Sequence, residues 1–324
     1  MGKLKARLGK LLLLALCLAW PPATAAAPPR QDLMARLPDG RRLHIECSGQ
    51  GSPTVVLESG FGATADAWFK VQPELARDTR ACAYDRAGYA SSDPGPAPRD
   101  GAAIAKDLDD GLRAARIAGP LVLVGHSAGA LYVQAFAARR PQDVAGMVLV
   151  DPSVAYQDQR FADFGPGAGS VAPLRARAAT CAAFLEGSLS LEDAAERDRC
   201  TQSAPHGPGT VGPLAFWRTE VAELDSLWGL TSAETPTGAA TLGALPLVVL
   251  TAGGAKASEP PSAAAMRWTY LHQEVAQRST IGAQRAVEGA SHLIMIDRPD
   301  AVIAAVREVI AEGGRRPKPV AGGP

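Results

Sequence analysis

The sequence predicts an α/β protein with a mostly parallel central sheet and helices on both of its faces. Short apolar runs alternate with helical patterns along most of the chain, which is the rhythm of βαβ units. The runs at 121–124 (LVLV) and 147–150 (MVLV) are continuously apolar, as in strands buried on both faces. The 324 residues are 47% apolar but only 5% aromatic, so small and branched aliphatic side chains form the core. A chain of this size and composition can bury a full globular core.

The first block of the pattern runs from residue 41 to residue 151. Helices are expected at 64–76, with an interruption before Pro73, and at 99–117 and 127–139. Strands are expected at 41–47, 54–58, 80–84, 121–124 and 147–150.

The second block begins with a strand at 245–250, followed by a helix at 262–277, a short strand at 286–288 and a helix at 299–311. Residues 152–243 separate the blocks and are too many for a loop, so they predict a helical cap on the sheet. Within the cap, Phe216, Trp217, Val221, Leu224 and Trp228 follow one helical face. We expect the aromatic members to shape an apolar substrate pocket. The predicted division is a signal peptide (1–27), a first core part (28–151), the cap (152–243), a second core part (244–313) and a disordered tail (314–324).

The amino terminus has the composition of a secretory signal. Four basic residues precede the apolar run 11–20, and an alanine-rich stretch ends at Ala27. The run is shorter than the roughly 20 residues that span a bilayer, which leaves a retained anchor as the alternative. Cleavage near Ala27 leaves 29 basic and 33 acidic residues, a net charge of −4. A net charge this close to zero does not indicate a nucleic-acid-binding surface. No stable membrane span is expected in the mature protein.

Export allows the four remaining cysteines to form disulfides. Cys181 and Cys200 flank a stretch that resembles two short helices, so we predict a bond between them. Cys47 and Cys82 lie in two predicted strands and either pair or remain separate buried thiols. The chain contains no C-x-x-C motif and no His/Cys cluster with zinc spacing, so a metal site is not indicated.

A candidate nucleophile lies in the pentapeptide Gly-His-Ser-Ala-Gly at 125–129. It follows the LVLV strand and opens the next predicted helix. Acyl-transfer chemistry needs Ser127 on such a sharp strand-to-helix turn, with glycines on both sides so that neighbouring backbone packs closely. A glycine-lined turn with a helix-capping serine is the alternative.

Three further segments accompany this pentapeptide in a fixed order. Residues 84–93 (YDRAGYASSD) are similar to a D-x-x-G-x-G-x-S segment, with Ala90 in place of the second glycine. Residues 58–62 (ESGFG) are similar to a His-Gly oxyanion segment, with Ser59 where histidine is common, and 289–292 (GASH) are similar to G-x-x-H. Together the four segments resemble the α/β-hydrolase family over nearly the whole mature sequence. The resemblance implies an α/β-hydrolase fold with the cap inserted after strand 6.

The resemblance also implies the roles of site residues. Ser127 is the expected nucleophile and His292 the expected base, while the backbone N–H groups of Phe61 and Ala128 form the oxyanion hole. A serine at this position argues against the dehalogenases and epoxide hydrolases of the family, which carry aspartate there. Asp85 is expected to brace loops, and His126 to pack or hydrogen-bond beneath the turn.

The acid that orients His292 has two candidates. Many relatives carry it after the seventh strand, where the first carboxylate of this chain is Glu259. Asp151 directly follows the sixth strand, from which the fold can deliver an acid to the same histidine. Asp151 is the preferred assignment and Glu259 the alternative, with a water or another acid remaining open.

The sequence therefore predicts an exported serine hydrolase that cleaves an ester-like bond without a cofactor. Its substrate is expected to be a small molecule with an apolar portion. Thioesterases, aminopeptidases and cofactor-free haloperoxidases share these motifs, and fold does not separate them. A ligand-binding protein that turns over slowly or not at all is the alternative from another class. The sequence does not indicate the oligomeric state.

Overall fold

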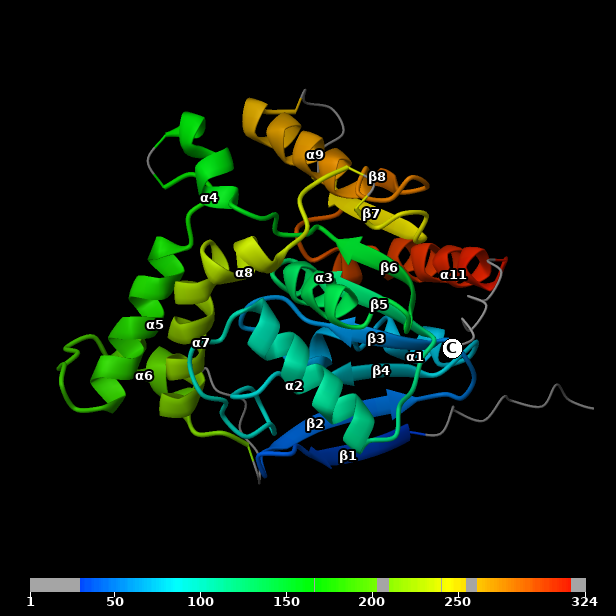
Figure 1. Cartoon of the computed structure of the whole chain (residues 1–324). Helices are drawn as coiled ribbons and strands as arrows, with labels where there is room; N and C mark the ends of the chain where they lie inside the picture. The colour runs from blue at the N-terminus through cyan, green and yellow to red at the C-terminus, as the bar shows by residue number, and fades with distance from the viewer. Residues whose placement is uncertain (1–29, 166, 203–209, 240, 255–260, 316–324) are drawn as a thin grey trace, which may run out of the picture.

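A single mixed sheet forms the centre of the molecule (Figure 1). The computed structural model describes residues 30–165, 167–202, 210–239, 241–254 and 261–315. Within them the strands are β1 (Arg30–Arg36), β2 (Arg42–Ser48), β3 (Thr54–Glu58), β4 (Ala81–Tyr84), β5 (Leu121–His126), β6 (Val144–Val150), β7 (Leu247–Ala252) and β8 (Ala283–Val287). Their order is β1-β2-β4-β3-β5-β6-β7-β8, antiparallel at β1/β2 and β2/β4 and parallel elsewhere. The predicted α/β class is confirmed.

Helices cover both faces of this sheet, as its continuously apolar central strands require. They are η1 (Ala65–Trp68), α1 (Gln72–Leu75), α2 (Gly101–Ala114), α3 (Gly129–Arg139), α9 (Ala263–Ala276), α10 (Ile294–Asp297) and α11 (Pro299–Arg315). One apolar core includes Leu108 of α2, Phe136 of α3 and Val275 of α9. The core on the other face includes Trp68 of η1 and Val306 of α11.

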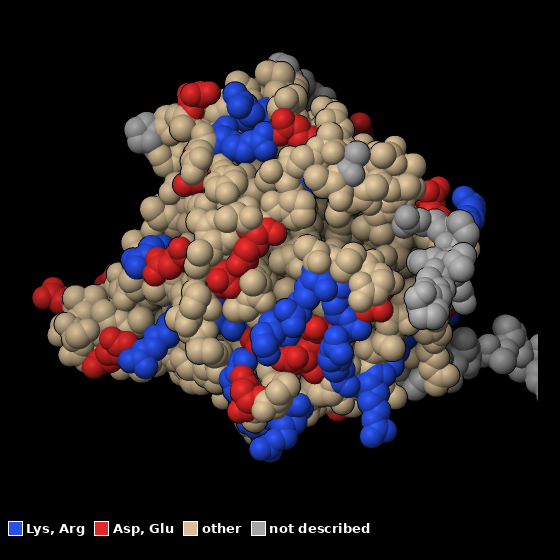
Figure 2. All heavy atoms as spheres, viewed as in Figure 1, with Lys and Arg blue, Asp and Glu red and all other residues tan. Residues whose placement is uncertain are grey.

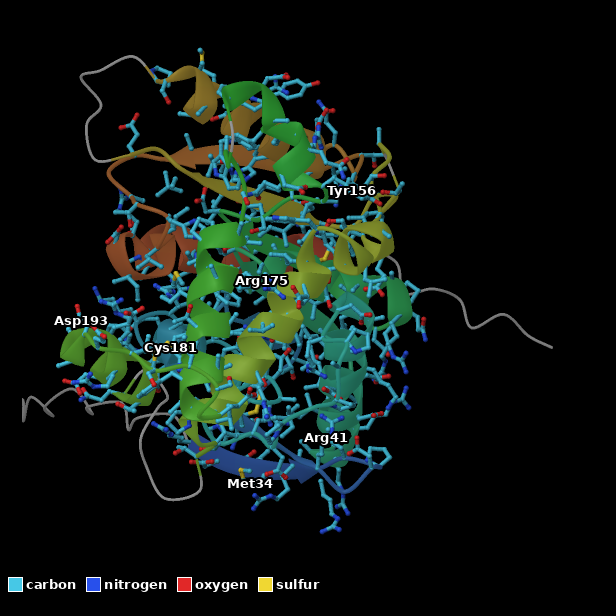
Figure 3. All side chains as sticks on the ribbon, turned by 90° about the vertical axis from the view of Figure 1, so that its left-hand side faces the viewer. Met34, Arg41, Tyr156, Arg175, Cys181 and Asp193 are labelled. Atoms are coloured by element: carbon cyan, nitrogen blue, oxygen red, sulfur yellow. A yellow bond between two sulfur atoms is a disulfide. The ribbon has the colours of Figure 1, made fainter. Side chains whose placement is uncertain are left out.

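The chain between β6 and β7 forms helices that lie beyond the carboxyl ends of the central strands (Figure 1). They are α4 (Gln157–Arg160), η2 (Ala162–Phe164), α5 (Ala172–Leu185), α6 (Ala194–Gln202), α7 (Pro213–Leu227) and α8 (Leu230–Glu234). Helices α5 and α7 pack side by side over that edge (Figure 3). This helical layer, called the cap below, occupies the segment for which the sequence predicts an insertion.

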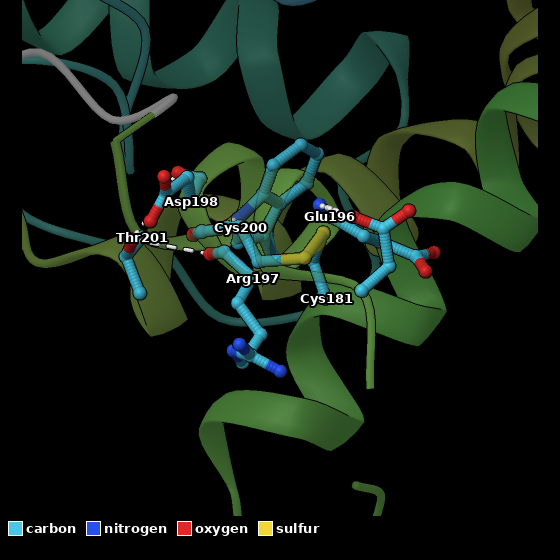
Figure 4. The surroundings of a disulfide bond; sticks show 8 residues. Cys181, Glu196, Arg197, Asp198, Cys200 and Thr201 are labelled. Atoms are coloured by element: carbon cyan, nitrogen blue, oxygen red, sulfur yellow. Dashed lines mark hydrogen bonds between the residues drawn. A yellow bond between two sulfur atoms is a disulfide. The ribbon is translucent and has the colours of Figure 1, made fainter. Parts of the chain in front are cut away.

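The interior of the cap is built around a disulfide and two aromatic side chains. Cys181 of α5 is bonded to Cys200 of α6, as predicted (Figure 4). Phe216 and Trp217 are buried against this disulfide, and Trp217 Nε1 donates to the carbonyl of Cys200 at 2.8 Å. The expectation that these two aromatics shape a substrate pocket is therefore wrong, because they fill the core of the cap. Trp228 differs, since it packs in the apolar cluster of α7 and α3.

The second disulfide joins Cys47 of β2 to Cys82 of β4. The two residues lie opposite each other in the antiparallel register of these strands. This resolves the choice that the sequence left open between a bond and two separate thiols.

Other expectations need correction. β1 was not predicted, because its side chains are mostly exposed and polar and its pairing with β2 is made by the backbone. The expected helix at 64–76 is two short helices, and Pro73 lies in the first turn of the second. Strand β5 extends to His126, so α3 begins at Gly129 rather than at Ser127. Helix α11 continues to Arg315, two residues into the expected tail, where Gly313 allows close contact with Ala145.

Some expectations fall on residues outside the described ranges, namely the signal peptide (1–27) and residues 316–324 of the tail. Among the described helices, none has the length and apolar character to cross a membrane. On the face seen in Figure 2, basic side chains gather over α2 and the β1–β2 hairpin with acidic side chains among them. Asp109, for example, pairs with Arg113, Arg139 and Arg140.

Candidate active site

Ser127 occupies a strained turn between β5 and α3. Its φ is +52°, a left-handed conformation that non-glycine residues rarely adopt. The flanking glycines permit the turn: a Cβ at Gly125 would lie 2.7 Å from the Cα of Ala130, and one at Gly129 only 2.5 Å from the carbonyl oxygen of Ser59. The turn is fixed further because Ser127 N–H donates to the carbonyl of Val150 at 3.1 Å. The pattern of glycines around Ser127 thus has a steric cause.

His292 contacts Asp151 across the ends of different strands. The two atoms His292 Nδ1 and Asp151 Oδ2 are 2.6 Å apart. Asp151 directly follows β6, is buried, and has a φ of +41°. Half of the His292 side chain is exposed. This geometry places a carboxylate on one nitrogen of the imidazole, while the other nitrogen has no hydrogen-bond partner among the described residues.

Two further groups hold the Asp151 carboxylate. Oδ1 accepts from the backbone N–H of Ala252 at 2.9 Å and from Trp268 Nε1 at 3.0 Å. Burial would raise the pKa of Asp151, but the hydrogen bonds from His292 and Ala252 and nearby histidine charge outweigh it and lower that pKa. Asp151 is therefore an anion at neutral pH.

Trp268 and a second histidine were not identified from the sequence. His272 on α9 is fully buried, with Nε2 2.9 Å from the carbonyl oxygen of Pro152 and Nδ1 2.8 Å from the Thr251 hydroxyl. It therefore fixes the backbone just after Asp151. No local motif marks Trp268 or His272, which come from a helix more than a hundred residues away in the sequence.

His126 lies beneath the turn, as expected. Its Nε2 is 3.0 Å from the carbonyl oxygen of His292, and the two rings are 4.7 Å apart. Burial, and then the charge of His292, lower the pKa of His126 to about 4. A neutral ring with its proton on Nε2 donates to that carbonyl, so His126 supports His292 rather than replacing it.

The loop after β3 runs against Ser127. A Cβ at Gly60 would lie 3.1 Å from the Ser127 Cβ and 2.7 Å from His126 Nδ1, so only glycine fits. Within the described part of the chain, the backbone N–H groups of Phe61 and Ala128 have no hydrogen-bond acceptor. Unpaired N–H groups on both sides of a hydroxyl are what a developing oxyanion requires. Ser127 Oγ itself makes no hydrogen bond to His292 among the described residues, a contact that often forms only with substrate.

Arg86 supports this loop and is a third residue that sequence reasoning missed. Its Nη1 donates to the carbonyl of Ser59 at 2.7 Å, and its Nη2 donates to that of Gly60 at 3.0 Å. The guanidinium also pairs with Glu58 of β3 and with Glu223 of α7. Arg86 and both acids are almost completely buried. Arg86 belongs to the YDRAGYASSD stretch that the sequence marks as notable, but no local pattern indicated which residues Arg86 would contact.

The charges around Arg86 are unbalanced, with two acids facing one cation. Burial, only partly opposed by Arg86, raises the pKa of Glu58 to about 7, and the Tyr84 hydroxyl donates to it. Burial and the neighbouring Glu223 raise the pKa of Glu220 to about 8. Glu220 approaches the loop as well, with Oε1 3.1 Å from the Cβ position of Gly62. The oxyanion loop thus rests on an acid-rich face of α7.

Asp85 has the bracing role expected of it. Its carboxylate accepts from the backbone N–H of Ala65 at 2.9 Å and contacts His44 Nδ1 at 2.7 Å. The hydrogen bond to Asp85 raises the pKa of His44 to about 9, although burial opposes it. The alternative acid Glu259 lies outside the described residues. Across the residues that the structure describes, no group of three or more His, Cys, Asp and Glu could hold a metal ion.

Comparisons with known proteins agree with this architecture. The sequence pattern of the alpha/beta hydrolase family matches residues 55–305. The protein YqjL of Bacillus subtilis is 32% identical over 117 residues, which are 36% of this chain and 46% of that protein. The chain spans less than half the length of the curated relatives it matches.

Solved structures share the fold over most of the chain. An esterase from Thermogutta terrifontis superposes with a TM-score of 0.58 at 18% identity, over 88% of this chain and 99% of that one. The epoxide hydrolase CorEH gives a TM-score of 0.58 at 19% identity, over 87% of this chain and 99% of that one. At these identities the likeness concerns the fold alone.

Proposed function

Because the chain belongs to the alpha/beta hydrolase family, we propose that it is an exported serine hydrolase that cleaves an ester-like bond through an acyl-enzyme. The observation that carries the proposal is the 2.6 Å contact between Asp151 and His292 at the sheet edge where Ser127 occupies its strained turn. A base oriented by an acid beside a serine hydroxyl is the arrangement that nucleophilic catalysis needs.

In the proposed reaction, Ser127 Oγ attacks the ester carbonyl carbon while His292 Nε2 takes the hydroxyl proton. The Asp151 carboxylate keeps the other imidazole proton on Nδ1 and stabilises the imidazolium. The carbonyl oxygen becomes an oxyanion and accepts from the N–H groups of Phe61 and Ala128. His292 then protonates the departing alkoxide, and a water, deprotonated by the same base, releases the acid from Ser127.

The substrate is proposed to carry an apolar portion. Phe61 and Trp228 lie in the same apolar cluster as Ala128, together with Leu224 of α7. This cluster borders the proposed oxyanion hole from the cap side, where an acyl or alcohol chain would be placed. The presence of an esterase among the structural neighbours is consistent with cleavage of an ester bond.

Export is supported by two independent features of the chain. The first 27 residues have the charge and hydropathy order of a secretory signal. The two disulfides persist in an oxidising compartment. Amino-terminal sequencing of protein recovered outside the cytoplasm is expected to begin near residue 28, and an intact leader would contradict export.

A fluorophosphonate probe tests the chemistry. It is expected to label the protein once, on Ser127, and Ser127→Ala is expected to lose the label. Label that is absent, or unaffected by this change, would remove the enzyme proposal. A single burst of ester cleavage without steady-state turnover would instead favour a ligand-binding protein.

A further inference from the structure

The cap helix α7 carries an acid that the proposed mechanism does not use. Glu220 is only 3% exposed. It precedes Leu224 by one helical turn, so the two side chains share a face of α7. Leu224 packs in the apolar cluster that also contains Phe61 and Ala128. Glu220 therefore lies on the face of α7 that meets the residues of the proposed oxyanion hole.

The carboxyl group of Glu220 lies against the loop that follows β3. A Cβ placed on Gly62 would be 3.1 Å from Glu220 Oε1 and, its own neighbours in sequence aside, would meet no other atom of the described chain within 4 Å. Gly62 is exposed and follows Phe61, whose backbone N–H is one of the two proposed oxyanion donors. The space beside Gly62 is therefore open apart from this carboxyl group.

No protein group satisfies the hydrogen-bonding capacity of the Glu220 carboxyl. Across the residues that the structure describes, Glu220 makes no hydrogen bond and no ion pair. Neither of its oxygens is among the enclosed polar atoms that lack a partner, so both oxygens reach solvent although the residue as a whole is buried. Water can bind them in the free protein, and a substrate group that enters beside Gly62 can replace this water.

The surroundings of Glu220 keep its carboxyl uncharged at neutral pH. Glu223, three residues further along α7, pairs with Arg86 and accepts from the Tyr89 hydroxyl at 3.0 Å. Arg86, and Arg177 of α5, favour an ionised Glu220, but burial and the charge of Glu223 outweigh them and raise its pKa to about 8. A protonated carboxyl has an O–H group that donates a hydrogen bond.

In the proposed reaction the ester carbonyl oxygen binds the N–H of Phe61, which adjoins Gly62. A substrate atom that contacts Glu220 is therefore only a few bonds from that carbonyl. Building on the proposed ester hydrolysis at Ser127, we propose that Glu220 determines substrate specificity by donating a hydrogen bond to an oxygen that lies close to the ester carbonyl. The preferred substrates are then esters with an ether, keto or hydroxyl oxygen at this position, rather than plain aliphatic esters.

Two pairs of esters that exchange a methylene group for an ether oxygen test this specificity. Benzyl methoxyacetate and benzyl butanoate place the exchange in the acyl chain, whereas 2-methoxyethyl and butyl phenylacetate place it in the alcohol. Their affinities are measured by NMR titration of the full mature chain carrying Ser127→Ala, so that no ester is cleaved. The preference is the ratio of affinities within a pair, and its change between variants cancels the different hydration of the two esters.

Removing the donor is expected to remove the preference for the ether oxygen. In one of the two pairs, Glu220→Leu is expected to lower the preference by about fivefold or more, since a hydrogen bond is lost without a replacement. The control is Asp225→Leu on the exposed side of α7, where Asp225 pairs with Arg175. It is expected to change the preference less than about twofold. An unchanged preference in both pairs of Glu220→Leu would overturn the proposal.

The pH dependence of the preference requires no change at Glu220. With Ser127→Ala as the only substitution, the preference is expected to fall between pH 7 and pH 9, because an ionised carboxyl cannot donate. Glu220→Gln keeps an N–H donor that does not titrate, so its preference is expected to stay constant over this range. A preference that is equally constant with Glu220 present would contradict donation by this residue.

These measurements are independent of the chemistry proposed for Ser127. Failure of a fluorophosphonate to label Ser127 would contradict the proposed function, whereas the affinity ratios are obtained without Ser127 and test the role of Glu220 alone. In the chain with Ser127, kcat/KM for the same esters is expected to show the same preference and the same loss in Glu220→Leu. Rates that follow Ser127 but show no dependence on Glu220 would leave the hydrolase proposal intact and exclude this specificity role.

Discussion

Arg86 of the core and Glu223 of the cap form a buried ion pair, with Nε 3.0 Å from Oε1 and Nη2 3.2 Å from Oε2. The same guanidinium also donates to the carbonyl groups of Ser59 and Gly60 and to the carboxylate of Glu58, and it lies over the ring of Tyr89. The position of α7 is therefore tied through one side chain to the loop that carries Phe61.

Removing the cap half of this pair is expected to affect both stability and catalysis. Glu223→Gln leaves Glu58 as the buried counter-charge of Arg86 but weakens the charge-assisted hydrogen bonds to the cap, which is expected to cost roughly 1.5–3 kcal/mol of unfolding free energy. At matched folded fraction, kcat for a short ester is expected to fall about tenfold with KM little changed, because a displaced loop weakens oxyanion stabilisation. Urea denaturation and initial rates measure the two effects.

The matched control is Glu186→Gln, which breaks the exposed pair between α5 and Arg218 of α7. Surface pairs contribute about 0–1 kcal/mol, so this variant is expected to resemble the parent protein. Equal effects of the two substitutions on stability and kcat would show that Arg86 has no special connection to the loop.

The acid of the proposed triad can be tested by isosteric substitution. Asp151→Asn is expected to lower kcat by roughly two to four orders of magnitude with KM little changed, since an amide favours the wrong imidazole tautomer. Trp268→Phe removes one hydrogen bond to the carboxylate and is expected to cost about tenfold or less. Glu259→Gln is the control and is expected to cost less than about tenfold. A large loss in Glu259→Gln with Asp151→Asn nearly intact would reverse the assignment.

Stability above neutral pH is expected to depend on His44. Its pKa is raised to about 9 in the folded protein, against about 6.5 when unfolded, by the hydrogen bond to Asp85. The stabilisation is therefore complete below pH 6.5 and is lost as pH rises through 9. Partial screening by solvent reduces it to roughly 1–2 kcal/mol. The difference in unfolding free energy between the parent and His44→Gln should shrink by this amount from pH 6 to pH 10; a constant difference would exclude the linkage.

Buried neutral histidines act in the opposite direction. Burial lowers the pKa of His272 to about 4, so the unfolded chain binds a proton between pH 6.5 and 4 that the folded protein does not. The neutral ring's contribution is present above pH 6.5 and is lost as pH falls, by roughly 2–3 kcal/mol at pH 4. Glu58 and Glu220, whose pKa values are raised by folding, shift stability in the opposite direction over part of this pH range. The contribution of His272 is therefore isolated by comparing the parent protein with His272→Gln. That variant should lose less stability on acidification than the parent; parallel curves would contradict a neutral buried His272.

Reduction of the cap disulfide is expected to loosen the cap before the core. Cys181 and Cys200 are 19 positions apart in the sequence, and closing a loop of this length contributes about 3 kcal/mol in the chain-entropy description. A variant with both cysteines changed to alanine should hydrolyse short esters at a near-parental rate while losing its discrimination between short and long acyl chains. Unchanged chain-length selectivity would show that the disulfide has no influence on the substrate region.

The fold was predictable because its evidence is local. Continuous apolar runs identify buried parallel strands, and glycines around Ser127 identify a turn that needs them. Asp151 was the preferred of two candidate acids for His292, and its contact with His292 fits the fold because the carboxyl ends of the parallel strands β6 and β8 lie at one edge of the sheet. The edge strand β1 was not predicted, because its side chains are mostly exposed and its pairing with β2 is made by backbone groups, which give no hydrophobic pattern in the sequence.

The supporting groups were not predictable for a different reason. Arg86 and Glu223 are separated by 137 positions, and Trp268 and Asp151 by 117, so their contacts exist only after the cap and α9 have packed. Sequence periodicity describes how one element meets the core, but not which polar side chains meet each other. The same limit explains why Phe216 and Trp217 were assigned to a pocket when they fill the cap.

The chain leaves the sheet after β6, forms the cap and re-enters the sheet as β7, and β6 and β7 are adjacent strands. An insertion between adjacent strands can in principle be exchanged for another of different length without altering the order of the sheet. Here the buried cation restricts that freedom, since any replacement must present an acid to Arg86 where Glu223 now lies. Grafts of foreign caps that lack this acid should fail even when their apolar surfaces fit, so compatibility between cap and core in this protein is a matter of charge as well as shape.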